Sequence, residues 1–317
     1  MTKDELRLEC ERLVSCKNLS DTAEVLNIFS EFFFRAVKEN HLESVNTQAD
    51  GEAKIVLQMM FTKILHLKKL ILGLSYIAED GSSLNTIIDP TIIASATRNI
   101  YETTSMFNLI YRNTQTDEEK LILHAMWVHA GLMFRHKFKS TLSSTENIEK
   151  FEHESLEMAK IVTFIEQTDL FKGLDDHNKN KIKTRLKEKE YLMRFENNQV
   201  KFLHWHDLVE VMGLKSEHFN HIYTYFSLYS HPSNVAVFQF SDMFTINNEE
   251  FYELANFNLK YALLLTSVFI ADFINLFPST LRIFETMKTH EQIAINLLNI
   301  MARDMQYSIN DKWKECE

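Results

Sequence analysis

The sequence predicts an all-α protein with the architecture of an irregular multi-helix bundle. Glycine and proline are scarce, with 6 and 3 residues among 317, and turn-rich β architectures and glycine-rich phosphate loops both need more. Apolar residues recur at three- and four-residue steps along most of the chain. The 45% hydrophobic content is enough for a large core, in one elongated helical domain or in two smaller ones, and we expect a single elongated domain over residues 1–317.

Periodic apolar segments fill the chain as far as residue 167. The helices expected there span 2–47 (two helices divided at 18–21), 52–79, 90–113, 117–139 and 144–167. Pro90 suits the first turn of its helix, Thr116 is a favourable N-cap, and either Ser143 or Ser144 could begin the helix that ends near residue 167. The helix at 52–79 is apolar nearly all round, which predicts a central position.

The second half of the chain is less uniform. Residues 175–194 are rich in lysine and arginine, so we expect a boundary or excursion at 168–203. This basic run could contact RNA or an acidic partner, but its interspersed glutamates favour a solvated helix face. Residues 235–246 alternate locally and could form a short β-hairpin. The remaining helices are expected near 207–212, 216–230, 248–276 and 279–306.

Charge and cysteine usage favour a cytoplasmic protein without a metal or cofactor. The net charge of −10 opposes indiscriminate attraction to nucleic acid or to an anionic membrane. The three cysteines are an odd number without metal-ligand spacing, and the charged N-terminus does not resemble a signal peptide. No histidine has the glutamate three residues before it that a ferritin-like site needs. The apolar window 261–277 contains Asp272 and Asn275, so we expect a buried core helix and no membrane partner.

Residues 216–234 form the most informative stretch. Ser216 is a favourable N-cap, and an apolar stripe at helical spacing predicts one helix that packs on one side. Pro232 ends this helix and places His231 beside its terminal carbonyls, where a protonated ring is favoured. The neighbouring polar face carries Tyr223, Ser227, Ser230 and His231.

A second polar feature lies on the helix at 90–113. Arg98 and Glu102 are four residues apart and share a face, so they can pair. The polar face that contains His231 could complete the hydrogen bonds of this pair. Two interpretations stay open: a structural network that fixes helix register, and a site that binds an anion or acts on a phosphodiester. In the second, His231 is the acid or base, Arg98 stabilises charge, and Ser227 and Glu102 are further catalytic candidates.

These two segments, RNIYETTSMFNLIY and YTYFSLYSHPS, resemble a family of uncharacterised all-helical bacterial proteins. The shared pattern is an Arg-x-x-x-Glu helix and a downstream Tyr-x-x-x-Ser-x-x-x-His-Pro ending, and it covers residues 90–113 and 216–234. The resemblance implies a shared site at Arg98, Glu102, Ser227 and His231, with Tyr223 at the tyrosine position.

The chain also resembles, distantly, the helical HEPN family, whose ribonuclease members carry an arginine and a histidine separated by four to six residues. Arg35 and His41 satisfy this spacing, although about one such pair is expected by chance in this sequence. His231 has no arginine at that distance before it.

The bacterial resemblance implies a cytosolic interaction module in stress or phage defence, with a protein partner or a second copy of the chain. The alternative is a HEPN-like, metal-independent ribonuclease that uses His231 or His41, with RNA as the partner.

Overall fold

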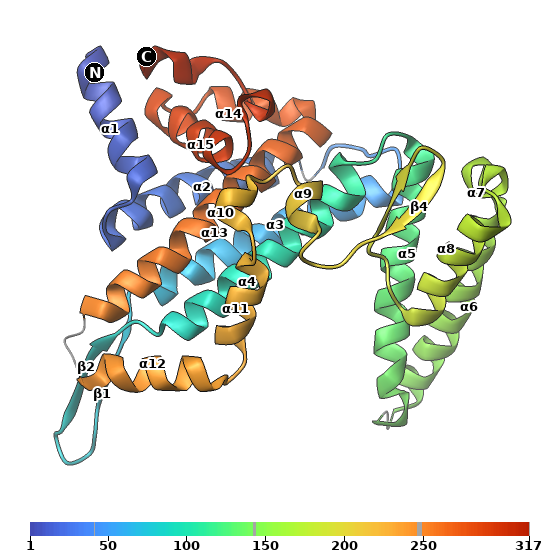
Figure 1. The fold of residues 1–317 in the computed structure, drawn as a ribbon, viewed down its shortest axis with the longest axis horizontal. Helices are drawn as coiled ribbons and strands as arrows, with labels where there is room; N and C mark the ends of the chain where they lie inside the picture. The colour runs from blue at the N-terminus through green and yellow to red at the C-terminus, as the bar shows by residue number, and fades with distance from the viewer. Residues whose placement is uncertain (41, 142–143, 246–248, 317) are drawn as a thin grey trace. The chain divides into compact units, whose positions relative to one another are not determined.

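The computed structural model describes residues 1–40, 42–141, 144–245 and 249–316. It is mostly helical with small antiparallel sheets, which confirms the predicted fold class. The chain divides into two compact units, one made of Met1–Asn108 with Leu208–Glu317 and the other of Leu109–Asp207 (Figure 1). Residues 168–203, where the sequence predicts a boundary or excursion, lie inside the second unit.

The first unit is built mainly from long helices. Its N-terminal part contains α1 (Lys3–Ser15), α2 (Leu19–Asn40), α3 (Gln48–Leu70), the hairpin strands β1 (Leu74–Ile77) and β2 (Ser83–Ile87), and α4 (Pro90–Phe107). Its C-terminal part contains α9 (Leu208–Val211), α10 (Ser216–Phe219), α11 (Ile222–Ser230), α12 (Asn234–Thr245), α13 (Glu249–Leu276), η3 (Pro278–Thr280), α14 (Leu281–Glu285), α15 (Thr289–Ala302), η4 (Met305–Tyr307) and η5 (Lys312–Cys316). Helix α4 packs against α11 and α13, so the two parts of the chain share one core.

Helix α13 is the centre of this core. It packs against α2, α4 and α15 and runs beside α4 in Figure 1. The rings of Phe107 and Phe269 lie 4.7 Å apart at this contact, and Phe33 of α2 adds a third ring 6.0 Å from Phe269. By length and composition, residues Tyr252–Leu276 could also cross a membrane, but 67% of their most apolar window is buried inside the protein.

A buried ion pair interrupts the apolar packing of α13. The Asp272 carboxylate accepts from Nη1 and Nη2 of Arg303 at 2.8 and 2.7 Å, and both side chains are at most 2% exposed. The Asn108 amide donates to the same carboxylate at 2.8 Å. A buried pair is tolerated when such added hydrogen bonds complete it. Asp272 is therefore compatible with a core helix.

The second unit continues from α4 through the π-helical turn η1 (Asn108–Arg112). It then contains α5 (Asp117–Arg135), η2 (His136–Thr141), α6 (Thr145–Gln167), α7 (Asp169–Gly173), α8 (Asp176–Glu188) and the strands β3 (Met193–Glu196) and β4 (Gln199–Phe202). Helix α5 packs against α6, α7 and α8. The buried Glu154 of α6 pairs with Arg135 of α5, which ties the two longest helices of this unit together.

The β-hairpin predicted near 235–246 is misplaced. The structure instead has helix α12 at Asn234–Thr245, where the Ser233 hydroxyl accepts from the Ala236 backbone N–H at 3.2 Å and caps the first turn. Among the described residues, the hairpins lie at β1–β2 and β3–β4. Asn197 and Asn198 connect β3 to β4 with φ of 51° and 60°, the backbone that a two-residue hairpin turn requires.

Two helix predictions also need correction. The helix predicted from Ser216 is broken at His221, which has φ of 63° and separates α10 from α11. The N-cap of α10 is Lys215 and not Ser216, and it makes no side-chain capping bond. Helix α3 ends at Leu70, before Gly73, and it is not buried all round, because Ile55 and Met59 are 58% and 45% exposed.

Candidate functional site

The candidate site begins on α4, whose start is fixed by its sequence. The Asp89 carboxylate caps the helix by accepting from the Thr91 backbone N–H at 2.8 Å, and Pro90 occupies the first helical position. Two turns further on, Arg98 Nε donates to Glu102 Oε1 at 2.9 Å. The side chains are 21% and 30% exposed, so the pair is half-buried. The four-residue spacing therefore produces the predicted ion pair.

Tyr223 of α11 completes this pair from across the helix interface. Arg98 Nη2 donates to the Tyr223 hydroxyl at 2.7 Å, and the hydroxyl donates to Glu102 Oε1 at 3.3 Å. The guanidinium carbon also lies 4.8 Å from the centre of the Tyr223 ring, a cation–π distance. The buried Tyr101 ring packs against the same tyrosine at 5.6 Å. Three polar groups thus form a closed set of hydrogen bonds.

Burial and charge shift the acidity of these groups. Desolvation raises the pKa of Tyr223 most, and the neighbouring Glu102 raises it further against the opposing effect of Arg98. Desolvation alone would lower the pKa of Arg98, but Tyr223 and Glu102 outweigh it and the pKa is raised. Both shifts keep the phenol neutral and the guanidinium charged. The hydroxyl therefore remains a donor to Glu102.

His231 lies at the open side of this set. Its Nε2 is 3.4 Å from Arg98 Nη1, and the side chain is exposed. A guanidinium has only donors, so a hydrogen bond here requires Nε2 to accept, with the ring neutral and its proton on Nδ1. The extended backbone of His231 leaves α11, and its N–H still donates to the Ser227 carbonyl at 3.2 Å. Proline at 232 thus places an accessible imidazole against a guanidinium.

The two serines of the predicted cluster do not join it through their hydroxyls. The Ser227 hydroxyl donates to the Tyr223 carbonyl at 2.8 Å, and the Ser230 hydroxyl donates to the Phe226 carbonyl at 2.8 Å. Both bonds run back to the preceding turn of the same helix. The structure therefore brings Arg98, Glu102, Tyr223 and His231 together, with the serine hydroxyls directed elsewhere.

Lys63 of α3 is a nearby cation that sequence reasoning missed. Its ammonium hydrogen-bonds the Asn99 side chain, next to Arg98. Desolvation lowers the pKa of Lys63, and the charge of Glu102 acts in the opposite direction. No local pattern links residue 63 to residue 98, so only the packing of α3 on α4 could reveal this neighbour.

The other histidine motifs have different surroundings. Arg35 of the Arg35–His41 motif hydrogen-bonds the Thr286 hydroxyl, and His41 lies outside the described residues. The His204 and His206 rings stack at 5.6 Å. Within the described part of the chain, no group of three histidine, cysteine, aspartate or glutamate side chains could hold a metal ion.

The arrangement at Arg98 combines a fixed cation, a phenol, a carboxylate and an exposed imidazole. Such a set can bind an anion through Arg98, and it can exchange a proton through His231. Comparison of the chain with protein-family models, curated proteins and solved structures found no match.

Proposed function

We propose that this protein is a cytosolic, bacterial interaction module that binds a protein partner or a second copy of itself. The observation that supports this most is the β1–β2 hairpin. Leu74, Tyr76 and Ile77 of β1 are 73%, 65% and 74% exposed. Monomeric soluble proteins rarely present several large apolar side chains together, and such patches are typical of interaction surfaces.

The base of this hairpin is closely packed. Gly73 has φ of 72°, and a Cβ there would lie 2.8 Å from the Ile87 carbonyl oxygen and 2.6 Å from the Thr86 methyl carbon. The opposite end closes through a hydrogen bond of 2.8 Å from the Ala78 N–H to the Ser82 carbonyl. A two-stranded hairpin is marginally stable alone, so a closely paired hairpin that exposes apolar residues is consistent with recognition.

The role in stress or phage defence is a further part of this proposal. It is supported by the resemblance of residues 90–113 and 216–234 to all-helical bacterial proteins. This part of the proposal concerns the cellular process in which the protein acts. The proposed interaction surface is still the β1–β2 hairpin.

The experiment compares Leu74→Ser/Tyr76→Ser with the wild type in light scattering after size exclusion and in native purification from the source cell. We expect the wild type to form a dimer or to retain a defined partner, and the variant to lose it with little change in melting temperature. Leu8→Ser is the matched control, because Leu8 of α1 is 66% exposed without apolar strand neighbours. A monomeric wild type that retains no partner would contradict the proposal.

The second candidate function is metal-independent ribonuclease activity, favoured by the 3.4 Å contact between Arg98 and His231. In this mechanism Nε2 of the neutral His231 leaves its contact with Arg98 and takes the proton of a ribose 2′-hydroxyl. The 2′-oxygen attacks the adjacent phosphorus, the bond from phosphorus to the 5′-oxygen breaks to leave a 2′,3′-cyclic phosphate, and the 5′-oxygen takes a proton from water. Arg98 stabilises the charge that develops on the phosphoryl oxygens. The two residues come from different helices, unlike the short Arg-to-His motif of HEPN ribonucleases.

This candidate is tested by incubating purified protein with RNA in the presence of a chelator. Cleavage by the wild type and its loss in His231→Ala, with an unchanged melting temperature, is the expected result. His221→Ala serves as the control, because His221 is also exposed and lies at the other end of α11. Equal cleavage by all three proteins would indicate a contaminating nuclease and would remove this candidate.

A further inference from the structure

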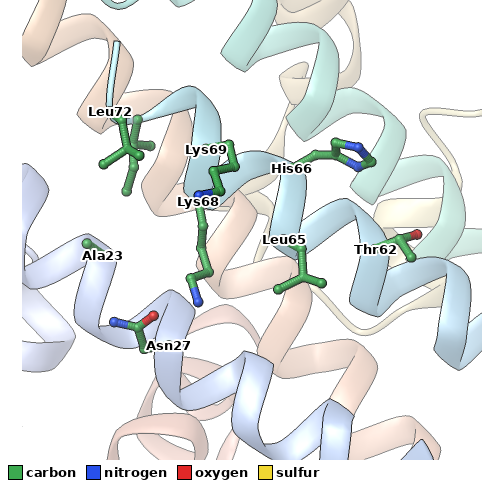
Figure 2. A pocket seen from close by; sticks show the side chains of 9 residues that line it. Ala23, Asn27, Thr62, Leu65, His66, Lys68, Lys69 and Leu72 are labelled. Carbon is green, nitrogen blue, oxygen red and sulfur yellow. The ribbon is translucent and has the colours of Figure 1, made fainter.

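A cavity of about 560 Å³ lies between α2 and α3 in the first unit (Figure 2). This volume falls in the range of small-molecule sites, roughly 300–1,000 Å³. Its lining residues are Ala23, Asn27, Thr62, Leu65, His66, Lys68, Lys69, Ile71 and Leu72. None of them belongs to the Arg98 site or to the β1–β2 hairpin, so the cavity is separate from both proposed functional surfaces.

One part of the lining is apolar. Leu65 and Leu72 are 38% and 65% exposed, although both lie beside the cavity. Ala23 of α2 faces them with only a methyl group, which leaves the space unfilled. A hydrocarbon chain placed here would remove these carbons from water, the main favourable contribution to apolar binding.

The charged part of the lining has one sign. Lys68 and Lys69 contribute two ammonium groups and no lining residue is acidic, although the chain carries a net charge of −10. In Figure 2 the Lys68 side chain extends from α3 toward the α2 residues Ala23 and Asn27, whereas His66 points away from them. The helix dipole favours cations in the last turn of α3, but it does not account for the apolar cavity beside them.

We propose that this cavity binds a medium-chain carboxylate, a fatty acid in its ionised form. The carboxylate would accept hydrogen bonds from Lys68 and from the Asn27 amide, and the chain would lie along Leu65 and Ile71. The lining follows α3 from Thr62 to its end at Leu70, about 12 Å, and continues to Ile71 and Leu72, which suits a linear molecule. The ionised head fits the two lysines, and the lining contains no phenylalanine, tyrosine or tryptophan on which a base could stack. This inference goes beyond the proposed function.

The first experiment titrates the full-length protein with octanoate, decanoate and dodecanoate, below their micelle concentrations, by calorimetry. Each buried methylene should tighten binding about fourfold, because hydrocarbon burial sets the chain-length dependence. Dodecanol and dodecyltrimethylammonium are the neutral and cationic controls, and both should bind at least tenfold more weakly than dodecanoate.

The second experiment uses variants of the lining. Lys68→Gln/Lys69→Gln should weaken dodecanoate binding roughly tenfold or more, because it removes the charge-assisted hydrogen bonds. Ala23→Phe should block the cavity and abolish binding while both lysines remain. Lys3→Gln/Lys17→Gln removes the same charge from exposed positions outside the lining and should bind like the wild type.

Three results would overturn the inference. One is the absence of saturable dodecanoate binding to the wild type. Another is equal binding of the carboxylate and the two control amphiphiles, which would indicate an unspecific apolar patch. The last is wild-type affinity in both the lysine variant and Ala23→Phe.

Discussion

Arg98 and Tyr223 are 125 residues apart in the chain, and the Arg98 guanidinium donates to the Tyr223 hydroxyl at 2.7 Å while it lies over the same ring. This contact joins α4 to α11 through a charged hydrogen bond and a cation–π interaction at once. It also positions Arg98 so that a second nitrogen faces His231. The tyrosine thus orients the cation of the candidate site.

Removing the hydroxyl of Tyr223 tests this role. Tyr223→Phe keeps the ring but deletes its bonds to Arg98 and Glu102, and we expect the free energy of unfolding to fall by about 1 to 2 kcal/mol. Urea denaturation measures the change. Tyr76→Phe is the control, because Tyr76 is 65% exposed and should change stability by less than about 0.5 kcal/mol. Equal effects of the two substitutions would mean that the hydroxyl of Tyr223 has no orienting role.

The buried pair between Asp272 and Arg303 should be a major determinant of stability. Asp272→Asn leaves the Arg303 charge uncompensated inside the core, so we expect a loss of about 3 to 5 kcal/mol. The double variant Asp272→Leu/Arg303→Met removes both charges and should recover most of this loss. Thermal unfolding followed by circular dichroism compares the three proteins. A single variant as stable as the wild type would contradict the uncompensated-charge argument.

Three glycines provide a matched test of backbone requirements. Gly73→Ala combines φ of 72° with a clash against the Ile87 carbonyl, so we expect it to destabilise the protein by more than about 1 kcal/mol. Gly81→Ala has φ of 85° but open space, and it should cost about 1 kcal/mol. Gly131→Ala lies in α5 with open space and should stabilise the second unit by about 0.5 to 1 kcal/mol. A different order in denaturant titrations would contradict these assignments.

The buried Cys16 thiol predicts a loss of stability at alkaline pH. Burial raises the pKa of this thiol to about 11, well above the ordinary value of a cysteine. The unfolded chain therefore releases the proton first, and stability falls as pH rises from about 9 to 11, by roughly 2 to 3 kcal/mol. Cys16→Ala should show a shallower decline in chemical denaturation over this window. Identical slopes for the two proteins would show that another group controls the alkaline limit.

The local features of the fold could be predicted from sequence. Asp89 and Pro90 placed the start of α4 correctly, and Thr116 caps α5 as expected. Of the two serines that could begin α6, Ser144 is its cap. These signals act within one turn of helix, so neighbouring residues determine them. The break at His221 could not be predicted in this way, because a non-glycine residue with positive φ is stabilised by tertiary packing.

The candidate site was predictable only in part. The four-residue spacing of Arg98 and Glu102 determined their pairing, whereas the identity of their third partner depended on how α11 packs on α4. We expected the polar face of that helix to supply it, and Tyr223 does so, but the serine hydroxyls bond within their helix. No local sequence pattern predicts that Lys63 lies near Arg98. Long-range contacts of this kind depend on packing and not on spacing.

The second unit is inserted into the first between Asn108 and Leu208, and this has a consequence for synthesis on the ribosome. Helix α4 emerges before either of its main packing partners, α11 and α13, has been translated. The apolar side of α4 stays without these partners while roughly a hundred further residues are synthesised, which takes about 5 to 20 seconds at ordinary elongation rates. During this time the apolar side of α4 is available for a chaperone to bind.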